Sequence, residues 1–143
     1  MRTLIAAVIL SLLAAPMAGA APKAKTEEPA VKIIPYVNID PVALPVISNG
    51  RVVNYVFVTM RVDLSASANT DLLRTKEPFF RDALVRLGHR APFNPPADFV
   101  TVDEARLCAA YLAEARAIAG AGAVTGVRII QQVPKSTRVA AGG

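Results

Sequence analysis

The chain has 143 residues, one cysteine, one histidine and a formal net charge of +5 at pH 7. A single cysteine excludes an internal disulfide, and a single histidine excludes a zinc site built from several histidines. The arginines are spread along the chain and are not interleaved with aromatic residues, so the charge predicts a solvated basic surface and no nucleic-acid site. Weak attraction to anionic head groups or acidic proteins is the functional alternative.

Residues 1–20 have the pattern of a bacterial export signal. One positive charge precedes an apolar run that begins at Leu4 and ends at Pro16. Small residues at Ala18 and Ala20 then predict cleavage after Ala20. The alternative is an uncleaved anchor, because the apolar stretch Leu4–Ala21 is marginally long enough to cross a bilayer, which needs ~20 residues and tolerates roughly 17. The predicted location is therefore periplasmic or secreted, or inner-membrane anchored if the segment is retained.

The remainder is predicted to form one domain over residues 31–133. Residues 21–30 contain two prolines, four charges and no large apolar side chain, which predicts a flexible leader. Residues 134–143 end in Ala-Ala-Gly-Gly and predict a disordered tail. The lone Cys108 is predicted to be a small buried apolar residue, with pairing to another molecule as the alternative.

Strands are predicted at the start of this domain. Val31–Ile39 and Val42–Ser48 are rich in β-branched residues, and each contains a proline that favours an edge position. Asn49 and Gly50 separate them from the long run Arg51–Leu64. Asn-Gly between such runs indicates a tight β-hairpin, because both turn residues must accept positive φ.

The run that follows the turn alternates with period two, which predicts one face toward a core. Asn54 is the exception on that face. Tyr55, Phe57 and Arg61 lie on the opposite face, and the two aromatic rings predict that this face is also covered near the turn. The predicted core-facing residues are Val52, Val56, Val58, Met60, Val62 and Leu64.

A helical period replaces the strand period after a polar break. Asn69 or Thr70 can cap the first helix. Pro78 either kinks this helix or divides it, with a short helix ending near Lys76. Gly88 is predicted to end the helical pattern. The predicted buried face consists of Leu72, Leu73, Lys76, Phe79, Phe80, Ala83, Leu84 and Leu87.

A second helical pattern follows a proline-rich loop. Thr101 and Glu104 have the spacing of a capping box, and Gly120 is predicted to end the helix. Its predicted apolar face consists of Leu107, Cys108, Tyr111, Leu112, Ala115 and Ile118. Val124–Val133 reads as a final strand. The predicted fold is therefore α+β: an antiparallel-rich sheet with an Asn-Gly hairpin, two helices on one face and a C-terminal strand.

The sequence offers few groups for catalysis. His89 is the only histidine, and no serine lies in a Gly-x-Ser-x-Gly elbow. Gly120, Gly122 and Gly126 lie between a helix and a strand, whereas a phosphate-binding loop lies between a strand and a helix. We therefore expect no enzyme activity, no metal and no cofactor.

Two stretches are candidate partner-binding surfaces. Arg81, Arg86 and Arg90 lie near one helix edge and can pair with carboxylates in bidentate fashion. A solvated helix face is the alternative. Phe93 and Phe99 flank prolines in the long loop and predict stiff, exposed apolar groups whose ordering costs little entropy. Packing of these rings across the helix ends is the alternative.

Four segments in a fixed order carry a family resemblance. They are the extended segment Tyr36–Ile39, the strand Tyr55–Val62, the helix Glu77–Leu84 with its proline–hydrophobic–Arg–Asp run, and the terminal strand Gly126–Gln132. In this order they resemble the extracytoplasmic domain of FliL-type proteins, which accompany the bacterial flagellar motor. Typical family members keep an N-terminal membrane helix, whereas this chain is predicted to lose its apolar segment.

The resemblance implies a stomatin-like fold, ring formation and association with stator units. We therefore expect a non-enzymatic periplasmic scaffold that acts through protein contacts. The expected partners are flagellar stator or basal-body components, or further copies of the chain, and no nucleic acid. A secreted, envelope-associated module that binds a small ligand or partner through the loop from Phe93 to Phe99 is the alternative. An envelope enzyme that depends on His89 is a third hypothesis.

Overall fold

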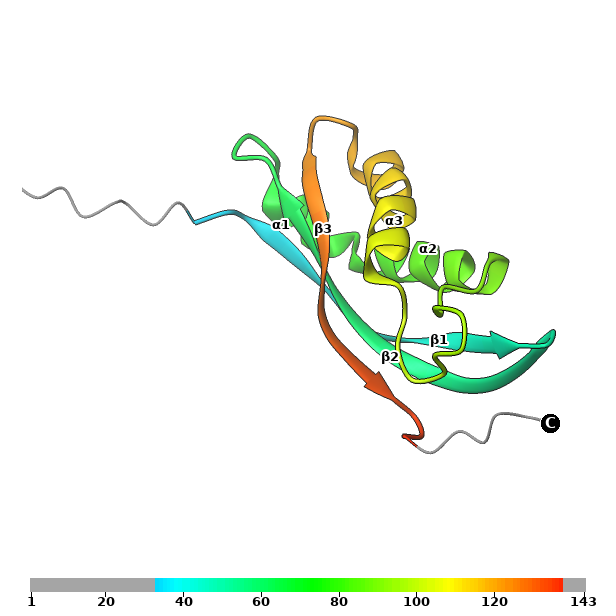
Figure 1. Cartoon of the computed structure of the whole chain (residues 1–143). Helices are drawn as coiled ribbons and strands as arrows, with labels where there is room; N and C mark the ends of the chain where they lie inside the picture. The colour runs from blue at the N-terminus through cyan, green and yellow to red at the C-terminus, as the bar shows by residue number, and fades with distance from the viewer. Residues whose placement is uncertain (1–32, 138–143) are drawn as a thin grey trace, which may run out of the picture. The chain divides into compact units, whose positions relative to one another are not determined.

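The computed structural model describes residues 33–137 (Figure 1). In chain order the elements are β1 (Tyr36–Ser48), β2 (Arg51–Leu64), α1 (Thr70–Thr75), α2 (Glu77–Arg90), α3 (Glu104–Ala119) and β3 (Val124–Pro134). The strands form one antiparallel sheet in the order β1–β2–β3. The predicted α+β class is therefore confirmed.

Several predictions from sequence fall on chain ends that the structure does not describe. The export segment 1–20, the leader 21–30 and residues 138–143 lie outside the described residues. Within residues 33–137, no helix is both long enough and apolar enough to span a membrane. The sheet extends slightly further than the sequence predicts, because Pro134 belongs to β3 and the amide of Lys135 donates to the carbonyl of Tyr55 at 2.8 Å.

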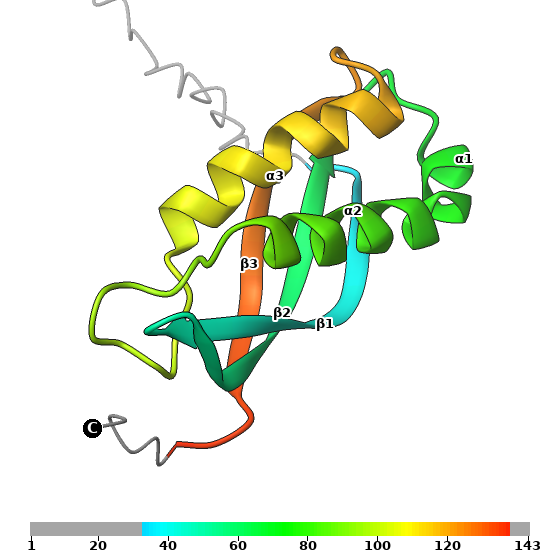
Figure 2. The same cartoon turned by 90° about the vertical axis from the view of Figure 1, so that its right-hand side faces the viewer.

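Helices α2 and α3 cover one face of the sheet, which we call the inner face (Figure 2). Helix α2 packs mainly on β1, α3 packs mainly on β3, and the two helices contact each other. The opposite face, here called the outer face, has no helix over it within the described residues (Figures 1 and 2). Packing of the helices on one face was predicted and is confirmed.

The hairpin between β1 and β2 forms as the sequence predicts. Asn49 and Gly50 have φ values of 49° and 73°, so both accept the positive φ that the two-residue turn requires. The two N-terminal strands predicted separately form one strand, β1, because an irregularity between Ile39 and Val42 absorbs the break and pairing with β2 resumes. β1 lies at the sheet edge, where Pro45 is tolerated.

The predicted alternation in β2 holds from Val56 to Leu64, whose core-facing members are buried. It is wrong at Val52, which is 50 % exposed. A register shift between Val46 and Ile47 changes the pairing there, so Val52 no longer shares the face of Val56. The predicted cover over Tyr55 and Phe57 is also wrong, because both rings are exposed on the outer face.

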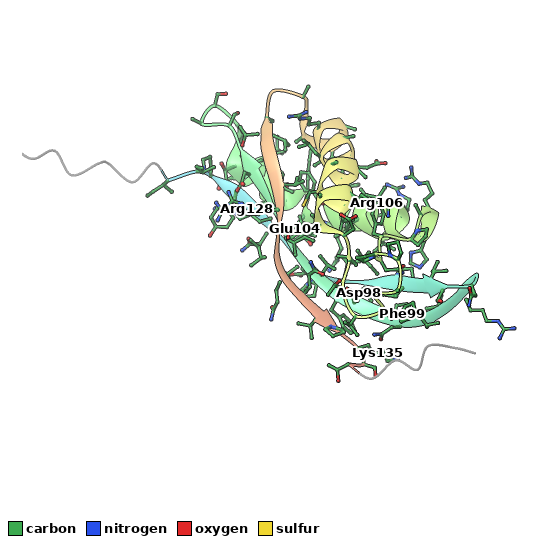
Figure 3. All side chains as sticks on the ribbon, in the orientation of Figure 1. Asp98, Phe99, Glu104, Arg106, Arg128 and Lys135 are labelled. Carbon is green, nitrogen blue, oxygen red and sulfur yellow. The ribbon has the colours of Figure 1, made fainter. Side chains whose placement is uncertain are left out.

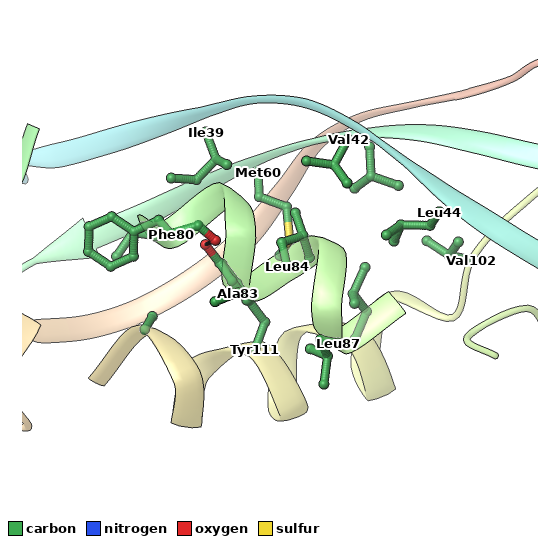
Figure 4. Close-up of a cluster of buried hydrophobic side chains, with 14 of the residues drawn as sticks. Ile39, Val42, Leu44, Met60, Phe80, Ala83, Leu84, Leu87, Val102 and Tyr111 are labelled. Atoms are coloured by element: carbon green, nitrogen blue, oxygen red, sulfur yellow. Dashed lines mark hydrogen bonds between the residues drawn. The ribbon is translucent and has the colours of Figure 1, made fainter. Parts of the chain in front are cut away.

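The core lies between the inner face and the two long helices (Figure 4). Met60 at the centre of β2 and Phe80 in α2 are fully buried. Of the two predicted caps, Asn69 is the one that caps α1, since its side chain accepts from the Leu72 amide at 3.0 Å. Pro78 lies in the first turn of α2, so the helical pattern is divided and not kinked.

This division explains why the predicted buried face of the helical region is partly wrong. Leu72 and Phe79 are 53 % and 63 % exposed, although the sequence places them with the core residues. A single helical period cannot run through α1 and α2, because Lys76 ends the first helix and precedes the second. The apolar residues Leu73, Phe80, Ala83, Leu84 and Leu87 do reach the core.

Gly88 does not end α2, which continues to Arg90. A Cβ atom at Gly88 would lie 2.5 Å from the Cδ2 atom of Leu44 in β1. Real Cβ atoms are essentially never found this close to another atom. The absence of a side chain at Gly88 therefore allows α2 to approach β1 closely. The prediction that Gly88 ends the helix is wrong.

The predicted capping box of α3 is also wrong. The N-cap is Asp103, whose carboxylate accepts from the Arg106 amide at 3.0 Å. The hydroxyl of Thr101 instead donates to the Asp98 carboxylate in the preceding loop. The predicted end of the helix is confirmed, since Gly120 adopts a φ of 97° that favours glycine.

Strand β3 does not follow the single alternation that the sequence predicts. Gln131 pairs with Thr59, but Ile129 pairs with Met60, so one extra residue, Ile130, lies between them. Such a bulge moves the following side chains to the other face. Val133, predicted to share the face of Ile129, therefore lies on the outer face.

Candidate functional site

The predicted basic helix edge is held in ion pairs. The pairs are Arg81 with Asp40 at 3.7 Å, Arg86 with Asp82 at 3.0 Å, and Arg90 with Glu114 at 3.3 Å. The neighbouring carboxylates therefore offset the positive charge that the sequence suggests. Exposed pairs of this kind contribute little to stability. A role of these arginines in partner binding stays a prediction.

The aromatic residues of the long loop pack inward. Phe93 is only 6 % exposed and belongs to the core, and the half-buried Phe99 packs against it. The guanidinium of Arg106 lies 5.7 Å from the centre of the Phe93 ring. The loop closes on α3 through the Asp103 amide, which donates to the Phe93 carbonyl at 2.6 Å. The predicted exposure is wrong for Phe93, which belongs to the core, whereas Phe99 keeps part of its surface exposed.

Polar side chains tie the same loop to the domain. The Asn94 side chain accepts from the Ile47 amide at 3.1 Å and donates to the Ile47 carbonyl at 3.2 Å. The Asp98 carboxylate accepts from the Thr101 hydroxyl and from the Val100 amide. These hydrogen bonds hold the pKa of Asp98 below its ordinary value, with the Thr101 hydroxyl as the largest cause. The loop is thus internally bonded.

The outer face of the sheet carries an exposed apolar patch, formed by Tyr55, Phe57 and Val133. Phe57 and Val133 are cross-strand partners, and Tyr55 lies two residues before Phe57 on the same face. Their exposed fractions are 36 %, 41 % and 44 %. The ammonium of Lys135 lies 5.8 Å from the centre of the Tyr55 ring. Apolar side chains are therefore contiguous on this face and bordered by a positive charge.

A second group on the outer face, here called the basic cluster, consists of Tyr36, Arg61, Asp63 and Arg128. The Nε atom of Arg61 donates to Oδ1 of Asp63 at 2.7 Å, and Nε of Arg128 donates to Oδ2 at 2.9 Å. The Arg61 guanidinium stacks 3.9 Å from the centre of the Tyr36 ring. Figure 3 shows Arg128 on the side of β3 away from α3. Two cations share one carboxylate, so one positive charge is uncompensated.

The sequence did not predict this cluster. It places Arg61 on the face opposite the core, but it does not show that Arg61 and Arg128 are direct cross-strand partners. That pairing depends on the register between β2 and β3, which a bulge at Ile130 changes. The available sequence signal was the Arg61-x-Asp63 spacing, which puts opposite charges on one side of a strand.

The remaining chemically distinctive residues are separate from the outer face. The half-buried Cys108 packs against the core, and burial raises the pKa of its thiol, with Glu104 adding a smaller effect. His89 lies exposed on α2, where its Nδ1 atom is 2.8 Å from the carbonyl of Val85. Over residues 33–137, no three His, Cys, Asp or Glu side chains are grouped so that they could hold a metal ion.

No protein-family model matches the chain, and no curated protein sequence matches it either. The resemblance to FliL-type domains therefore stays a prediction from the sequence pattern.

Proposed function

We propose that the protein is a non-enzymatic scaffold or accessory domain of the bacterial envelope that acts through protein–protein contacts made by the outer face of its sheet. The observation that carries this proposal is the apolar patch of Tyr55, Phe57 and Val133. Binding of a partner over these contiguous apolar side chains lowers the free energy, because it removes apolar surface from water. One face of the sheet builds the core, and no helix within residues 33–137 covers the other.

A protein surface suits this patch better than a small molecule does. The patch lies on neighbouring strands and so presents a broad face, and aromatic side chains are enriched at protein interfaces. The rings are carried by paired strands, so little conformational entropy is lost on binding. By contrast, Phe93, which the alternative hypothesis of ligand binding requires at the surface, is buried.

The FliL resemblance suggests where such a domain works. It covers Tyr36–Gln132, and the predicted export signal leads the chain out of the cytoplasm. Within the proposal, the partners are flagellar stator or basal-body components, or further copies of the chain arranged in a ring. This assignment to the flagellar motor rests on the resemblance, whereas the binding role of the outer face rests on the exposed patch.

The test compares two matched double variants. Phe57→Ser plus Val133→Ser removes the patch, and Leu72→Ser plus Phe79→Ser removes a similar exposed apolar pair from α1 and α2. Each is expressed in the host in place of the native protein. We expect the first variant to reduce swimming and cross-linking to stator components, and the second to retain both. Melting temperatures are measured to show that both variants fold.

Two results would count against the proposal. If swimming and stator cross-linking persist in both folded variants, the outer face is not the contact surface. If deletion of the whole gene leaves swimming unchanged while the patch variant still loses a cross-linked partner, the scaffold role stands and the flagellar assignment fails.

A further inference from the structure

We infer that Arg61 and Arg128, ordered by Asp63 and Tyr36, form a carboxylate-binding site on the outer face, and that its ligand is an acidic side chain of a partner protein segment. This inference rests on the proposed function, because it takes the outer face as the contact surface. It adds the chemistry by which the partner is recognised.

The first support is the set of hydrogen-bond donors that Asp63 leaves unused. Arg61 donates to Asp63 only through Nε, and Arg128 donates through Nε and Nη2. Within residues 33–137, both terminal amino groups of Arg61 and the Nη1 group of Arg128 have no acceptor. A carboxylate accepts from guanidinium groups in bidentate fashion, so these donors match its geometry.

The second support is that the two cations are held in place before any ligand arrives. Asp63 is 7 % exposed and fixes both guanidinium groups, and the Tyr36 ring stacks on Arg61. The side chain of Arg61 is only 24 % exposed, whereas that of Arg128 is 48 % exposed. Arginine normally loses much rotamer freedom on binding, and pre-ordering lowers that cost.

The third support is the cross-strand arrangement. Arg61 and Arg128 are direct partners in the ladder, and like charges in this position disfavour the sheet. One carboxylate cannot neutralise both. Opposite Asp63 the sheet has Gly126, where an added Cβ atom would meet nothing within 4 Å, so the approach to the cluster is open on that side. An incoming carboxylate would complete the neutralisation.

The neighbouring patch narrows the ligand class to a protein segment. Phe57 lies four residues before Arg61 on the same face, a separation of about 13 Å along the strand. An extended partner segment has the same rise per residue, so its acidic residue and an apolar residue four positions away would meet the basic cluster and the apolar patch together. A free anion would use the cluster alone.

The site is tested by nuclear magnetic resonance on the full exported chain, with the Nε–Hε resonances of the arginines as probes. Sodium acetate is titrated at constant ionic strength against sodium chloride, and inorganic phosphate is titrated in a parallel series. We expect acetate to shift Arg61 and Arg128 saturably and to leave Arg86 unchanged. Arg128→Gln should weaken acetate binding about tenfold. Arg86→Gln, which makes the same charge change, should not weaken it.

Three results of this titration would overturn the inference. Equal acetate shifts at all exposed arginines would show charge screening without a site. If phosphate binds saturably and acetate does not bind, the site recognises phosphate and not a carboxylate. If Glu27→Gln plus Glu28→Gln shifts Arg61 and Arg128 before any anion is added, the acidic residues of the same chain occupy the site and a partner carboxylate is excluded.

The cross-linking assay separates this inference from the proposed function. We expect Arg128→Gln to lose the partner as Phe57→Ser plus Val133→Ser does, with Arg86→Gln as the control that retains it. Loss in the patch variant with full retention in Arg128→Gln would overturn the carboxylate site and leave the scaffold role intact. Retention in both would show that the outer face is not the contact surface and would overturn a partner carboxylate as the ligand of the site.

Discussion

The hydroxyl of Tyr111 in α3 donates a hydrogen bond to the backbone carbonyl of Phe80 in α2, with 2.9 Å between the oxygens. Both side chains are fully buried, so this bond joins the two helices inside the core. Burial, with a smaller contribution from Glu77, raises the pKa of Tyr111 far above that of a free tyrosine. The hydroxyl therefore stays a donor over the accessible pH range.

We expect Tyr111→Phe to lower the free energy of unfolding by about 1 kcal/mol, because it removes one hydrogen bond and keeps the ring. Tyr111→Ala should cost about 3–5 kcal/mol, because it also leaves a cavity. Urea denaturation of the two variants measures both values. Equal losses would mean that the ring adds nothing to the packing of α2 and α3.

Gly88→Ala should destabilise the protein although alanine favours helix. The higher helix propensity of alanine stabilises the fold by about 1 kcal/mol, but overpacking of the new methyl group against the buried Leu44 destabilises it by about 1–3 kcal/mol. Gly122→Ala is the matched control, since a Cβ atom there meets nothing within 4 Å. We expect a lower melting temperature only for Gly88→Ala. An increase in that variant would show that α2 can move away from β1 at little cost.

Met60→Asp is expected to unfold the domain, because it places an unpaired charge at a fully buried position of β2. Circular dichroism of the purified variant measures the loss of structure. Met60→Leu is the control, since a swap of similar volume costs less than about 1.5 kcal/mol. A folded Met60→Asp variant would contradict the observed register of β2 against the core.

The structure changes the expected effect of Arg61→Asp on stability. Alternation alone places Arg61 opposite the core and predicts that this change is tolerated. The structure shows Arg61 paired with Asp63 at 2.7 Å, so the variant would set two carboxylates side by side. We expect a loss of about 1–3 kcal/mol, against less than about 1 kcal/mol for Arg86→Asp on the exposed helix surface. If thermal denaturation shows equally small losses of stability in both variants, the basic cluster does not stabilise the fold.

Asp98 gives the loop an acid-sensitive contribution to stability. Its pKa is lowered in the folded protein by hydrogen bonds to the ionised carboxylate. The stabilisation by Asp98 is therefore fully present above the ordinary aspartate pKa of about 3.9. It is lost as the pH falls through the lowered pKa that Asp98 has in the folded protein. Asp98→Asn should melt earlier than the native protein at neutral pH, and the difference should shrink in acid. A difference that stays constant from neutral to strongly acidic pH would contradict this account.

Part of the candidate site was accessible from the sequence. Alternation placed Tyr55, Phe57 and Arg61 on the face of β2 opposite the core, and this is where they lie. The exposure of Tyr55 and Phe57 was predicted wrongly, because period two shows which side chains share a face but not what covers that face. The arginines of α2 were predicted as a basic edge, but their carboxylate partners come partly from β1 and α3, which are distant in the chain.

Features that depend on neighbours along the chain could be predicted from the sequence. The Asn49-Gly50 turn and the alternation of β2 from Val56 to Leu64 follow from local sterics and hydrogen bonding, and the sequence named Asn69 as one of two caps and a division at Pro78 as one of two outcomes. Features that depend on the distance between elements could not be predicted. Gly88 meets Leu44 because α2 approaches β1 closely, and Phe93 is buried because its loop folds back over the core.

The same distinction holds for the basic cluster. Arg61 and Arg128 become neighbours only through the register of β2 and β3, and the bulge at Ile130 sets which side chains of β3 face outward. A slip of one residue in a strand moves every side chain to the other face, and the alternation within β3 alone does not show where its bulge falls. The position of the bulge is selected when β3 packs against β2 and α3 in the assembled fold.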